Sequence, residues 1–504
     1  MSLNDTLVQI TGNISDLMYS YLLVFLLVAC AIYFTARTKG VQFRLLGDMF
    51  KQIGEKKHVE GEKSVSSFQA MMISTASRVG TGNIAGVAVA IAAGGPGAVF
   101  WMWLMALLGS ATAFVESTLA QIWKVRGDEG EFRGGPAYYI QQALHSRAFG
   151  ILFAIFLILC FALGFNGLQA YNMTSAIQYY FVEQDYKAIA LVMGLATAAF
   201  FGFVVFGGSK LISTITSVLV PIMAFTYIGL ALFVTITNIG LLPQVMSFIF
   251  TYAFDFQSLA GGLAGSMILL GIKRGLFSNE AGMGSAPNAA AAASVSHPVK
   301  QGLVQSLSVY IDTIIICSCT AFMVMVYYVK VAGAGIGGDA GLSGMTLVQY
   351  AIANEVGPVG IHFITFAIVC FAFSSMVGNY YYAESNIKFI KNDRIVLTVF
   401  RICCMLVILM GCMSSFDLAW NLADITMGLM AIENLIAIVV LGKWAFKALE
   451  DYEEQKKAGK DPIYLSEKFE AMGMPHAECW HVDALHLEQL GGNTIKEYVD
   501  EALS

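Results

Sequence analysis

Long apolar runs recur along this chain and limit the folds that it can adopt more than any other feature. Each run is about 20 residues long, the length that an α-helix needs to cross roughly 30 Å of hydrocarbon. Of the 504 residues, 57% are hydrophobic and only 13% are charged, whereas about a quarter of a soluble globular chain is charged. The sequence therefore predicts an all-α polytopic membrane protein. A soluble helical protein would need charged outer faces that these runs lack.

Eleven transmembrane spans are expected, several of them longer than 25 residues and therefore tilted or interrupted. They lie at about 17–35, 66–95, 97–123, 148–180, 187–207, 211–238, 258–294, 299–329, 358–387, 394–413 and 417–442. Most of the nine cysteines lie in these spans and none forms a C-x-x-C pair, so they are expected to be small buried side chains. The net charge of −6 implies no nucleic-acid partner.

The loops differ strongly in lysine and arginine, which sets the expected orientation. One set of loops carries Arg37, Lys39, Arg44, Lys51, Lys56, Lys57, Lys63, Lys124, Arg126, Arg133, Arg147, Lys210, Lys300, Lys388, Lys391 and Arg394. The alternate loops carry only Lys187 and Lys330. We therefore expect a cell-membrane protein with its N-terminus outside, and with segment 36–63 and the tail after Lys443 in the cytoplasm. The first 16 residues contain no Lys or Arg, so a signal-peptide n-region is not expected before the first span.

Segment 36–63 is too polar to span the membrane. It is expected to lie on the cytoplasmic surface as an amphipathic helix, with its apolar side formed by Phe43, Leu46, Met49, Phe50 and Ile53. The tail 443–504 is expected to be soluble and partly helical. It contains His476, Cys479, His481 and His486, but their spacing matches no familiar zinc site, so a metal is not expected there.

Two of the apolar spans contain residues that fit poorly in a membrane helix. Segment 77–97 reads SRVGTGNIAGVAVAIAAGGPG, and segment 271–285 reads GIKRGLFSNEAGMGS. With the orientation above, span 66–95 starts at the cytoplasm and span 258–294 starts outside, and four spans follow each. The core thus predicts two five-helix halves of opposite topology, each opening with an interrupted helix, a pattern typical of secondary transporters. The alternative for each segment is a small-residue packing face or a kink. This alternative explains a single segment better than two segments in matching positions.

An interrupted helix offers a binding site because its backbone groups lose their helical partners. Glycine permits the break, and the break is tolerated in a membrane only where protein or a water-filled cavity covers it. A helix that ends near Val79 presents free carbonyls to a cation, and one that restarts near Asn83 presents free N–H groups to a carboxylate. One broken helix therefore predicts both halves of a site for a cation and an amino acid.

Three stretches carry a family resemblance: STASRVGTGNIAGVA (74–88), FRGGPAYYI (132–140) and GIKRGLFSNEAGMGSAPNAAA (271–291). They resemble the signatures of the alanine or glycine:cation symporter family, and the match extends over essentially the whole chain, including the extra first helix. The resemblance implies Na⁺-coupled uptake of alanine and glycine, on the fold shared with neurotransmitter:sodium symporters. It implies residues 1–63 as an extra transmembrane helix with the amphipathic segment, 64–238 and 239–442 as inverted repeats, and 443–504 as the tail.

The resemblance also implies roles for individual residues. The amides of Thr81 and Gly82 would bind the substrate carboxylate, and Asn83 would shape the site. The remaining substrate-site residues would be Gln169, Phe277 as an apolar wall, Ser278 and Gly282. Sodium would be bound by the carbonyls of Ala76, Val79 and Phe371 and by the hydroxyls of Ser374 and Ser375. Serines in apolar helices also bond back to their own helix, and this alternative remains open for Ser374 and Ser375.

In span 148–180, Asn166, Gln169 and Asn172 follow one another at intervals of three and share a helix face. They are expected near mid-membrane, where polar side chains also join neighbouring helices.

The chain departs from the family pattern at Arg78 and Asn379. Arg78 at membrane depth needs an anionic or carbonyl partner, for which Glu280 and Glu116 are candidates. Arg274 is expected to pair with an acid such as Asp312, or to snorkel. Further candidates for a proton-coupling group are the acids Glu116, Asp312, Asp424 and Glu433.

The sequence thus predicts a secondary symporter with alanine or glycine and sodium as its ligands, without a cofactor, nucleic acid or obligatory protein partner. The alternative within transport is a proton-coupled carrier or exchanger for another small amino acid, and the alternative from another class is a transporter-like amino-acid sensor. A membrane enzyme is disfavoured because Ser374 and Ser375 have no histidine partner in a matching span.

Overall fold

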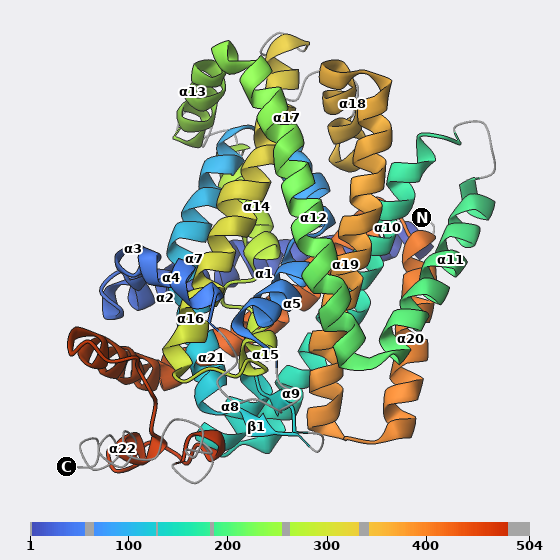
Figure 1. Cartoon of the computed structure of the whole chain (residues 1–504). Coiled ribbons are helices and arrows are strands. Elements are labelled where there is room, and N and C mark those ends of the chain that lie inside the picture. The colour runs from blue at the N-terminus through green and yellow to red at the C-terminus, as the bar shows by residue number, and fades with distance from the viewer. Residues whose placement is uncertain are drawn as a thin grey trace.

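The structure, a computed structural model, describes residues 3–55, 65–127, 130–181, 186–254, 263–331 and 342–481. Over these ranges the chain is helical, apart from loops and a two-stranded antiparallel ribbon formed by β1 (Val125–Arg126) and β2 (Phe132–Arg133). Most long helices run in a common direction and form a bundle (Figure 1). The short helices α13 and α18 lie at one end of the bundle, and β1, α8 and α22 lie at the other (Figure 1).

The first half of the chain contains α-helices joined by loops or by π-helical turns, which are labelled η. The elements are α1 (Leu3–Met18), η1 (Tyr19–Leu23), α2 (Val24–Arg37), α3 (Val41–Arg44), α4 (Leu46–Ile53), α5 (Ser67–Arg78), η2 (Gly82–Gly86), α6 (Val87–Gly94), α7 (Gly97–Ile122), α8 (Pro136–Ala143), α9 (Arg147–Ile158), η3 (Leu159–Phe165), α10 (Asn166–Gln178), α11 (Tyr186–Phe206) and α12 (Gly208–Thr237).

The second half continues in the same manner, and its elements η4 and η7 are 3₁₀ turns. The elements are η4 (Ile239–Leu241), α13 (Leu242–Ala253), α14 (Leu263–Asn279), α15 (Ala286–Ala291), α16 (Pro298–Val309), η6 (Tyr310–Cys317), α17 (Ser318–Lys330), α18 (Gly344–Val356), α19 (Pro358–Ile390), α20 (Arg394–Cys412), α21 (Phe416–Lys457), α22 (Ser466–Glu470) and η7 (Glu478–Trp480).

The number of membrane-spanning helices is close to the number expected. Within the described ranges, nine helices are long and apolar enough to cross a membrane, and α5 with α6 forms a tenth that is bent by 53°. The remaining expected span, 258–294, begins among residues outside the described ranges. Its helix α14 ends at Asn279 after 17 residues, so this span is interrupted.

The first helix is longer than the predicted span 17–35. Elements α1, η1 and α2 follow one another without interruption from Leu3 to Arg37, and Gly40 ends this stretch with a left-handed φ of 67°. The polar start of α1 packs on α21, where Asn421 Nδ2 donates to the carbonyl of Val8 at 3.2 Å. This tertiary contact extends the helix beyond the predicted span. A hydropathy profile does not reveal such a contact. The helix runs across the bundle instead of along it (Figure 1).

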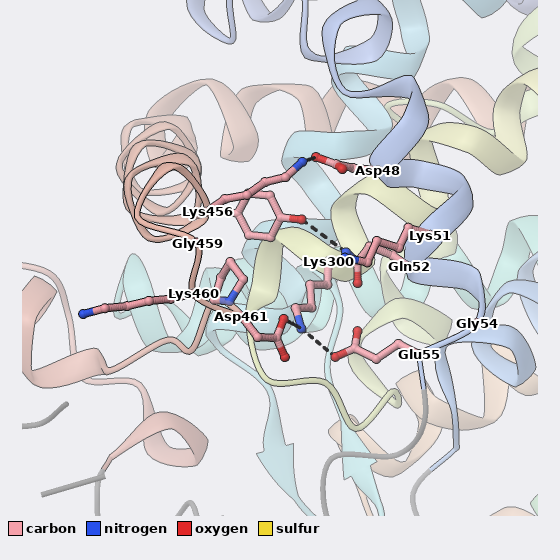
Figure 2. A pocket seen from close by; sticks show the side chains of 12 residues that line it. Asp48, Lys51, Gln52, Gly54, Glu55, Lys300, Lys456, Gly459, Lys460 and Asp461 are labelled. Carbon is pink, nitrogen blue, oxygen red and sulfur yellow. Dashed lines mark hydrogen bonds and ion pairs between the residues drawn. The ribbon is translucent and has the colours of Figure 1, made fainter. Parts of the chain in front are cut away.

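The loops that are rich in lysine and arginine meet at the end of the bundle near α22. Lys300 at the start of α16 binds Glu55 after α4 at 2.7 Å and Asp461 after α21 at 2.8 Å. Lys456 forms an ion pair with Asp48. These pairs line a pocket of about 530 Å³ (Figure 2). The segment predicted to be amphipathic is helical in α3 and α4, but its residues 56–63 lie outside the described ranges.

Candidate functional site

The first predicted break lies where α5 ends. A capping box at Ser66 and Gln69 starts α5, and the chain leaves helical geometry at Val79, where ψ is 81°. Two N–H groups that helical bonding would satisfy are then taken by side chains. Gly80 N donates to Asn83 Oδ1 at 3.0 Å, and Thr81 N donates to Gln169 Oε1 at 3.0 Å. The break is therefore covered by protein, as a break at membrane depth must be.

The second break separates α14 from α15. Glu280, Gly282 and Gly284 have positive φ values of 54°, 88° and 81°, a conformation that glycine adopts readily. Glu116 of α7 accepts hydrogen bonds from the backbone N–H of Gly282 at 3.2 Å and from that of Gly284 at 3.1 Å. Asn434 Nδ2 donates to the same carboxylate at 2.8 Å and to the Gly282 carbonyl at 2.9 Å. One buried acid thus replaces the carbonyls of a missing helical turn.

The two broken helices lie side by side and run in opposite directions. Gly94 is close to Leu270, Gly86 to Arg274 and Gly82 to Phe277. Ser77 Oγ contacts Glu280 Oε1 at 2.9 Å. Residue numbers thus fall along one helix as they rise along the other. The two helices are therefore antiparallel, and their breaks are adjacent.

Oxygen atoms from the first break and from α19 gather in one place. Ser375 Oγ donates to the Ala76 carbonyl at 2.9 Å and lies 3.4 Å from the Val79 carbonyl. Ser374 Oγ donates to the Phe371 carbonyl at 3.0 Å, within its own helix. All five residues are buried. The predicted sodium ligands therefore form two groups, Ser375 with Ala76 and Val79, and Ser374 with Phe371 in the bond back to its own helix.

The other side of the first break faces α10 and α14. Gln169 Oε1 accepts the hydrogen bond of the Thr81 N–H, and Asn172 Nδ2 donates to Thr81 Oγ1 at 2.9 Å. A Cβ atom added to Gly82 would lie 2.1 Å from the Phe277 ring, so the ring packs directly on the backbone of the break. Phe165 completes this wall, with its ring centroid 4.6 Å from that of Phe277. Gln169 and Phe277 of the predicted substrate set thus lie against the first break, whereas Gly282 lies at the second break beside Glu116 and Asn434.

Asn83 connects the breaks to η6. Its Nδ2 contacts Asp312 Oδ1 at 2.5 Å, Ser278 Oγ at 3.2 Å and Cys317 Sγ at 3.3 Å. Ser278 donates to the other carboxylate oxygen of Asp312. A buried carboxylate, a hydroxyl and a thiol therefore lie around the side chain that begins the second half of the broken helix.

Comparison with known proteins assigns the family. Residues 4–466 match the sodium:alanine symporter family. The chain belongs to this family. It is 45% identical over 477 residues to a Bacillus subtilis protein named probable sodium/glutamine symporter GlnT, covering 94% of this chain and 96% of GlnT. It is 34% identical over 458 residues to the sodium/alanine symporter AgcS of Methanococcus maripaludis, covering 89% of this chain and 98% of AgcS.

Among solved structures, the symporter chain resembles MhsT in complex with L-phenylalanine. The TM-score is 0.54 at 17% identity, over 77% of this chain and 96% of MhsT. This likeness confirms the transporter fold that the two interrupted spans predict. Family membership makes the chain a multi-pass membrane transporter and not an enzyme.

Arg274 of the symporter pairs with an acid, as one of the two alternatives predicted, but the acid named for it is wrong. Arg274 does not pair with Asp312: its Nη2 contacts both carboxylate oxygens of Asp424 on α21, at 2.8 and 2.7 Å. Its guanidinium also lies 4.3 Å from the Trp420 ring centroid. Asp312 instead bonds Asn83 and Ser278. Arg274 projects from α14 toward α21. The spacing of residues along the sequence does not predict this direction.

Arg78 and Asn379, where the symporter departs from the family pattern, each have specific partners. Arg78 Nε lies 4.0 Å from Glu280 Oε2, as one of the two alternatives predicted, and its Nη1 contacts Ser308, whereas Glu116 holds the second break. Asn379 contacts Ser77 at 2.7 Å and Asn166 at 3.0 Å. A Cβ added to the neighbouring Gly378 would lie 2.6 Å from the backbone N of Ser77.

Sequence reasoning missed the positions of Asp312 and Gly378 at the site. It named Asp312 among the intramembrane acids, but nothing along the sequence places its carboxyl group beside Asn83. Gly378 follows the two serines at an interval of one helical turn, and that spacing is a signal that could have pointed to a close approach of α19 and α5.

Proposed function

We propose that this chain is a sodium-coupled symporter that imports small neutral amino acids, alanine and glycine, by alternating access. The observation that carries the proposal is that the first break has two chemically different sides. On one side, the carbonyls of Ala76 and Val79 meet the hydroxyl of Ser375. On the other, the amide of Thr81 faces an acceptor on Gln169. Oxygen ligands and an N–H donor are what a hard cation and a carboxylate require.

The substrate carboxylate would bind the amides of Thr81 and Gly82. Gln169 Oε1 now accepts the hydrogen bond of Thr81, and a carboxylate oxygen is an acceptor of the same kind. Asn83 and Ser278 would shape this side, and Gly282 would keep the second break beside it. The Phe277 ring against Gly82 leaves little room for a long side chain, which favours a hydrogen or methyl group by steric exclusion.

Sodium would bind the carbonyls of Ala76, Val79 and Phe371 and the hydroxyls of Ser374 and Ser375. These groups come from α5 and α19, so a bound cation would hold the two helices together. Inward movement of one cation provides about 2.3 kcal/mol per 100 mV of membrane potential, which can drive the accumulation of a zwitterion without net charge.

The proposed architecture has residues 64–238 and 239–442 as inverted repeats, preceded by 1–63 and followed by the tail 443–504. The antiparallel arrangement of the two broken helices supports this division. The proposed orientation places the N-terminus outside and the tail in the cytoplasm. The meeting of loops around Lys300 and Lys456 at one end of the bundle supports it (Figure 2), because one side of the membrane collects the lysines and arginines.

Glutamine is a second candidate substrate, because the relative GlnT is named a sodium/glutamine symporter. Uptake into proteoliposomes distinguishes the possibilities. Labelled alanine is offered with an inward Na⁺ gradient, or with K⁺ or choline at a matched potential, and unlabelled glycine, glutamine and larger amino acids compete. We expect uptake that requires Na⁺ and is blocked by glycine. Equally strong block by glutamine would favour glutamine as the substrate over alanine and glycine. Uptake that follows only a pH gradient would favour the proton as the coupling ion over sodium. Na⁺-dependent binding without uptake would indicate a sensor.

The cation site has its own test within this assay. Ser375→Ala removes the hydroxyl that touches two carbonyls of α5, so the Na⁺ concentration for half-maximal uptake should rise at least tenfold. Thr226→Ala removes a hydroxyl that, among the described residues, bonds to the Ile222 carbonyl of its own helix α12, and its Na⁺ dependence should match that of the unmodified protein. An unchanged Na⁺ dependence of Ser375→Ala would contradict the proposed cation site.

A further inference from the structure

The tail beyond α21 contains a cluster of histidine and glutamate side chains that transport does not require. Helix α22 carries Glu467 and Glu470, and the chain then turns at Gly473, where φ is 84°. It returns along α22 through His476 and His481. Along the sequence these residues have no familiar metal spacing, but the turn brings their side chains to one place.

Three atoms of this cluster have the mutual distances of metal ligands. Glu470 Oε1 lies 3.0 Å from His481 Nε2 and 3.4 Å from His476 Nδ1. The two ring nitrogens are 3.1 Å apart. Zinc binds nitrogen and oxygen tetrahedrally at about 2.0–2.1 Å, so neighbouring ligand atoms are separated by roughly 3.3 Å. The three atoms therefore match one face of such a tetrahedron.

The contact behind His481 also suits a metal. Its Nδ1 lies 3.1 Å from Glu467 Oε1. A carboxylate accepts the hydrogen of Nδ1, which leaves Nε2 as the ring atom that faces the cluster and can bind a metal. There Nε2 faces Glu470 Oε1. A proton can join two of the three facing atoms, whereas a metal ion binds all three at once. A carboxylate behind a ligating histidine is common at metal sites.

The neighbouring residues hold these ligands in place. Ala477 N donates to Glu470 Oε1 at 3.0 Å. Trp480, directly before His481, is buried and donates from Nε1 to the carbonyl of Gln121 at the end of α7 at 2.7 Å. The side chain of His476 is 67% exposed, so the fourth tetrahedral position opens to solvent and can hold water.

We propose that Glu470, His476 and His481 bind Zn²⁺ or a related divalent transition metal, with Glu467 as a positioning residue. The ion joins α22 to the segment 475–481 and so holds the tail against the end of α7. This site is independent of the transport site, and its presence or absence does not bear on the proposed function.

The full chain, purified with an affinity tag that contains no histidine and stripped of metal with a chelator, is titrated with Co²⁺. We expect one metal per chain with the intense visible absorption of tetrahedral Co²⁺, and displacement by Zn²⁺. The double variant His476→Ala/His481→Ala should bind at least 100-fold more weakly. Glu467→Gln should weaken binding about 10-fold, because it loses only the carboxylate behind His481. His145→Asn is the control and should bind as the unmodified chain does, since asparagine tolerates the left-handed φ of 53°.

Thermal unfolding provides a second readout. Zn²⁺ should raise the melting temperature of the unmodified chain and of His145→Asn, because a ligand that binds the folded state stabilises it, and should leave that of the double variant unchanged. Without metal, the double variant should melt near the unmodified chain, because His476 is exposed. Equal metal binding by the double variant and the unmodified chain, or the weak absorption of octahedral Co²⁺, would overturn the proposal.

Discussion

At the scale of single residues, the first break depends on atoms that approach closer than any side chain allows. Gly80 lies between the cation side and the substrate side. A Cβ at this position would be 2.3 Å from Ser375 Oγ and 2.8 Å from Gln169 Nε2. Gly80 does not have a positive φ, so space, and not backbone conformation, requires glycine here.

Gly80→Ala should therefore disturb both proposed ligands at once. We expect at least a 100-fold loss of uptake, with higher half-saturating concentrations of both Na⁺ and alanine. Gly229→Ala is the matched control, because no atom of the described residues lies within 4 Å of its added Cβ on α12, and its uptake should be normal. If Gly80→Ala changed the dependence on only one of the two ligands, the division of the break into two adjacent sites would be incorrect.

Sequence reasoning located the break and its immediate neighbours but not the full set of contacts. Spacing by three on one helix correctly grouped Asn166, Gln169 and Asn172, because that inference needs only helical geometry. The contact of Asn83 with Asp312 joins residues 229 positions apart. Such a contact depends on how α5, α14 and η6 pack, so the sequence named Asp312 as a candidate without giving its role.

At the scale of elements, one ion pair fixes the broken helix α14 to α21. Arg274 and Asp424 are almost fully buried, and Arg274 lies one helical turn before Phe277. Lys273 adds a weaker contact to Asp424 at 3.9 Å. The pair therefore sets the position of the helix that carries the apolar wall of the proposed substrate site.

Breaking this pair should cost stability because it leaves a buried charge without its close partner. Arg274→Ala and Asp424→Asn should each lower the free energy of unfolding by about 3–5 kcal/mol. Lys330→Ala, which removes the partly exposed partner of Glu355 while Asn238 Nδ2 still donates to that carboxylate, should cost no more than about 1 kcal/mol. Thermal melting of the purified protein measures the difference. Equal effects of Arg274→Ala and Lys330→Ala would show that the Arg274 pair does not hold α14.

Element boundaries illustrate which parts of the fold are local. The break before Gly82 follows from glycine and polar residues within an apolar span, so its position was predictable. The start of the first helix at Leu3 was not, because residues 3–16 mix polar and apolar side chains and the sequence does not reveal their contact with α21. The same applies to the partner of Arg274.

At the scale of the whole molecule, the two ends of the bundle differ in charge, and this difference predicts its orientation. Cysteine labelling tests it in a Cys403→Ser background, since Cys403 is exposed. In intact cells, a membrane-impermeant maleimide should label Lys187→Cys but not Lys391→Cys, which should react only after permeabilisation. The reverse pattern would invert the proposed topology and place the tail outside.

The first helix has a consequence for the surrounding membrane. Its 33-residue candidate span is about 50 Å long at 1.5 Å per residue, whereas the hydrocarbon core is roughly 30 Å thick. A helix of this length fits only if it is steeply inclined or extends beyond the core. Its outer face exposes Leu17, Tyr21 and Phe25, and these side chains meet the lipid tails. The packing of α1 on α21 sets the inclination of this helix, so α21 receives through it any strain that a change in bilayer thickness places on the first helix.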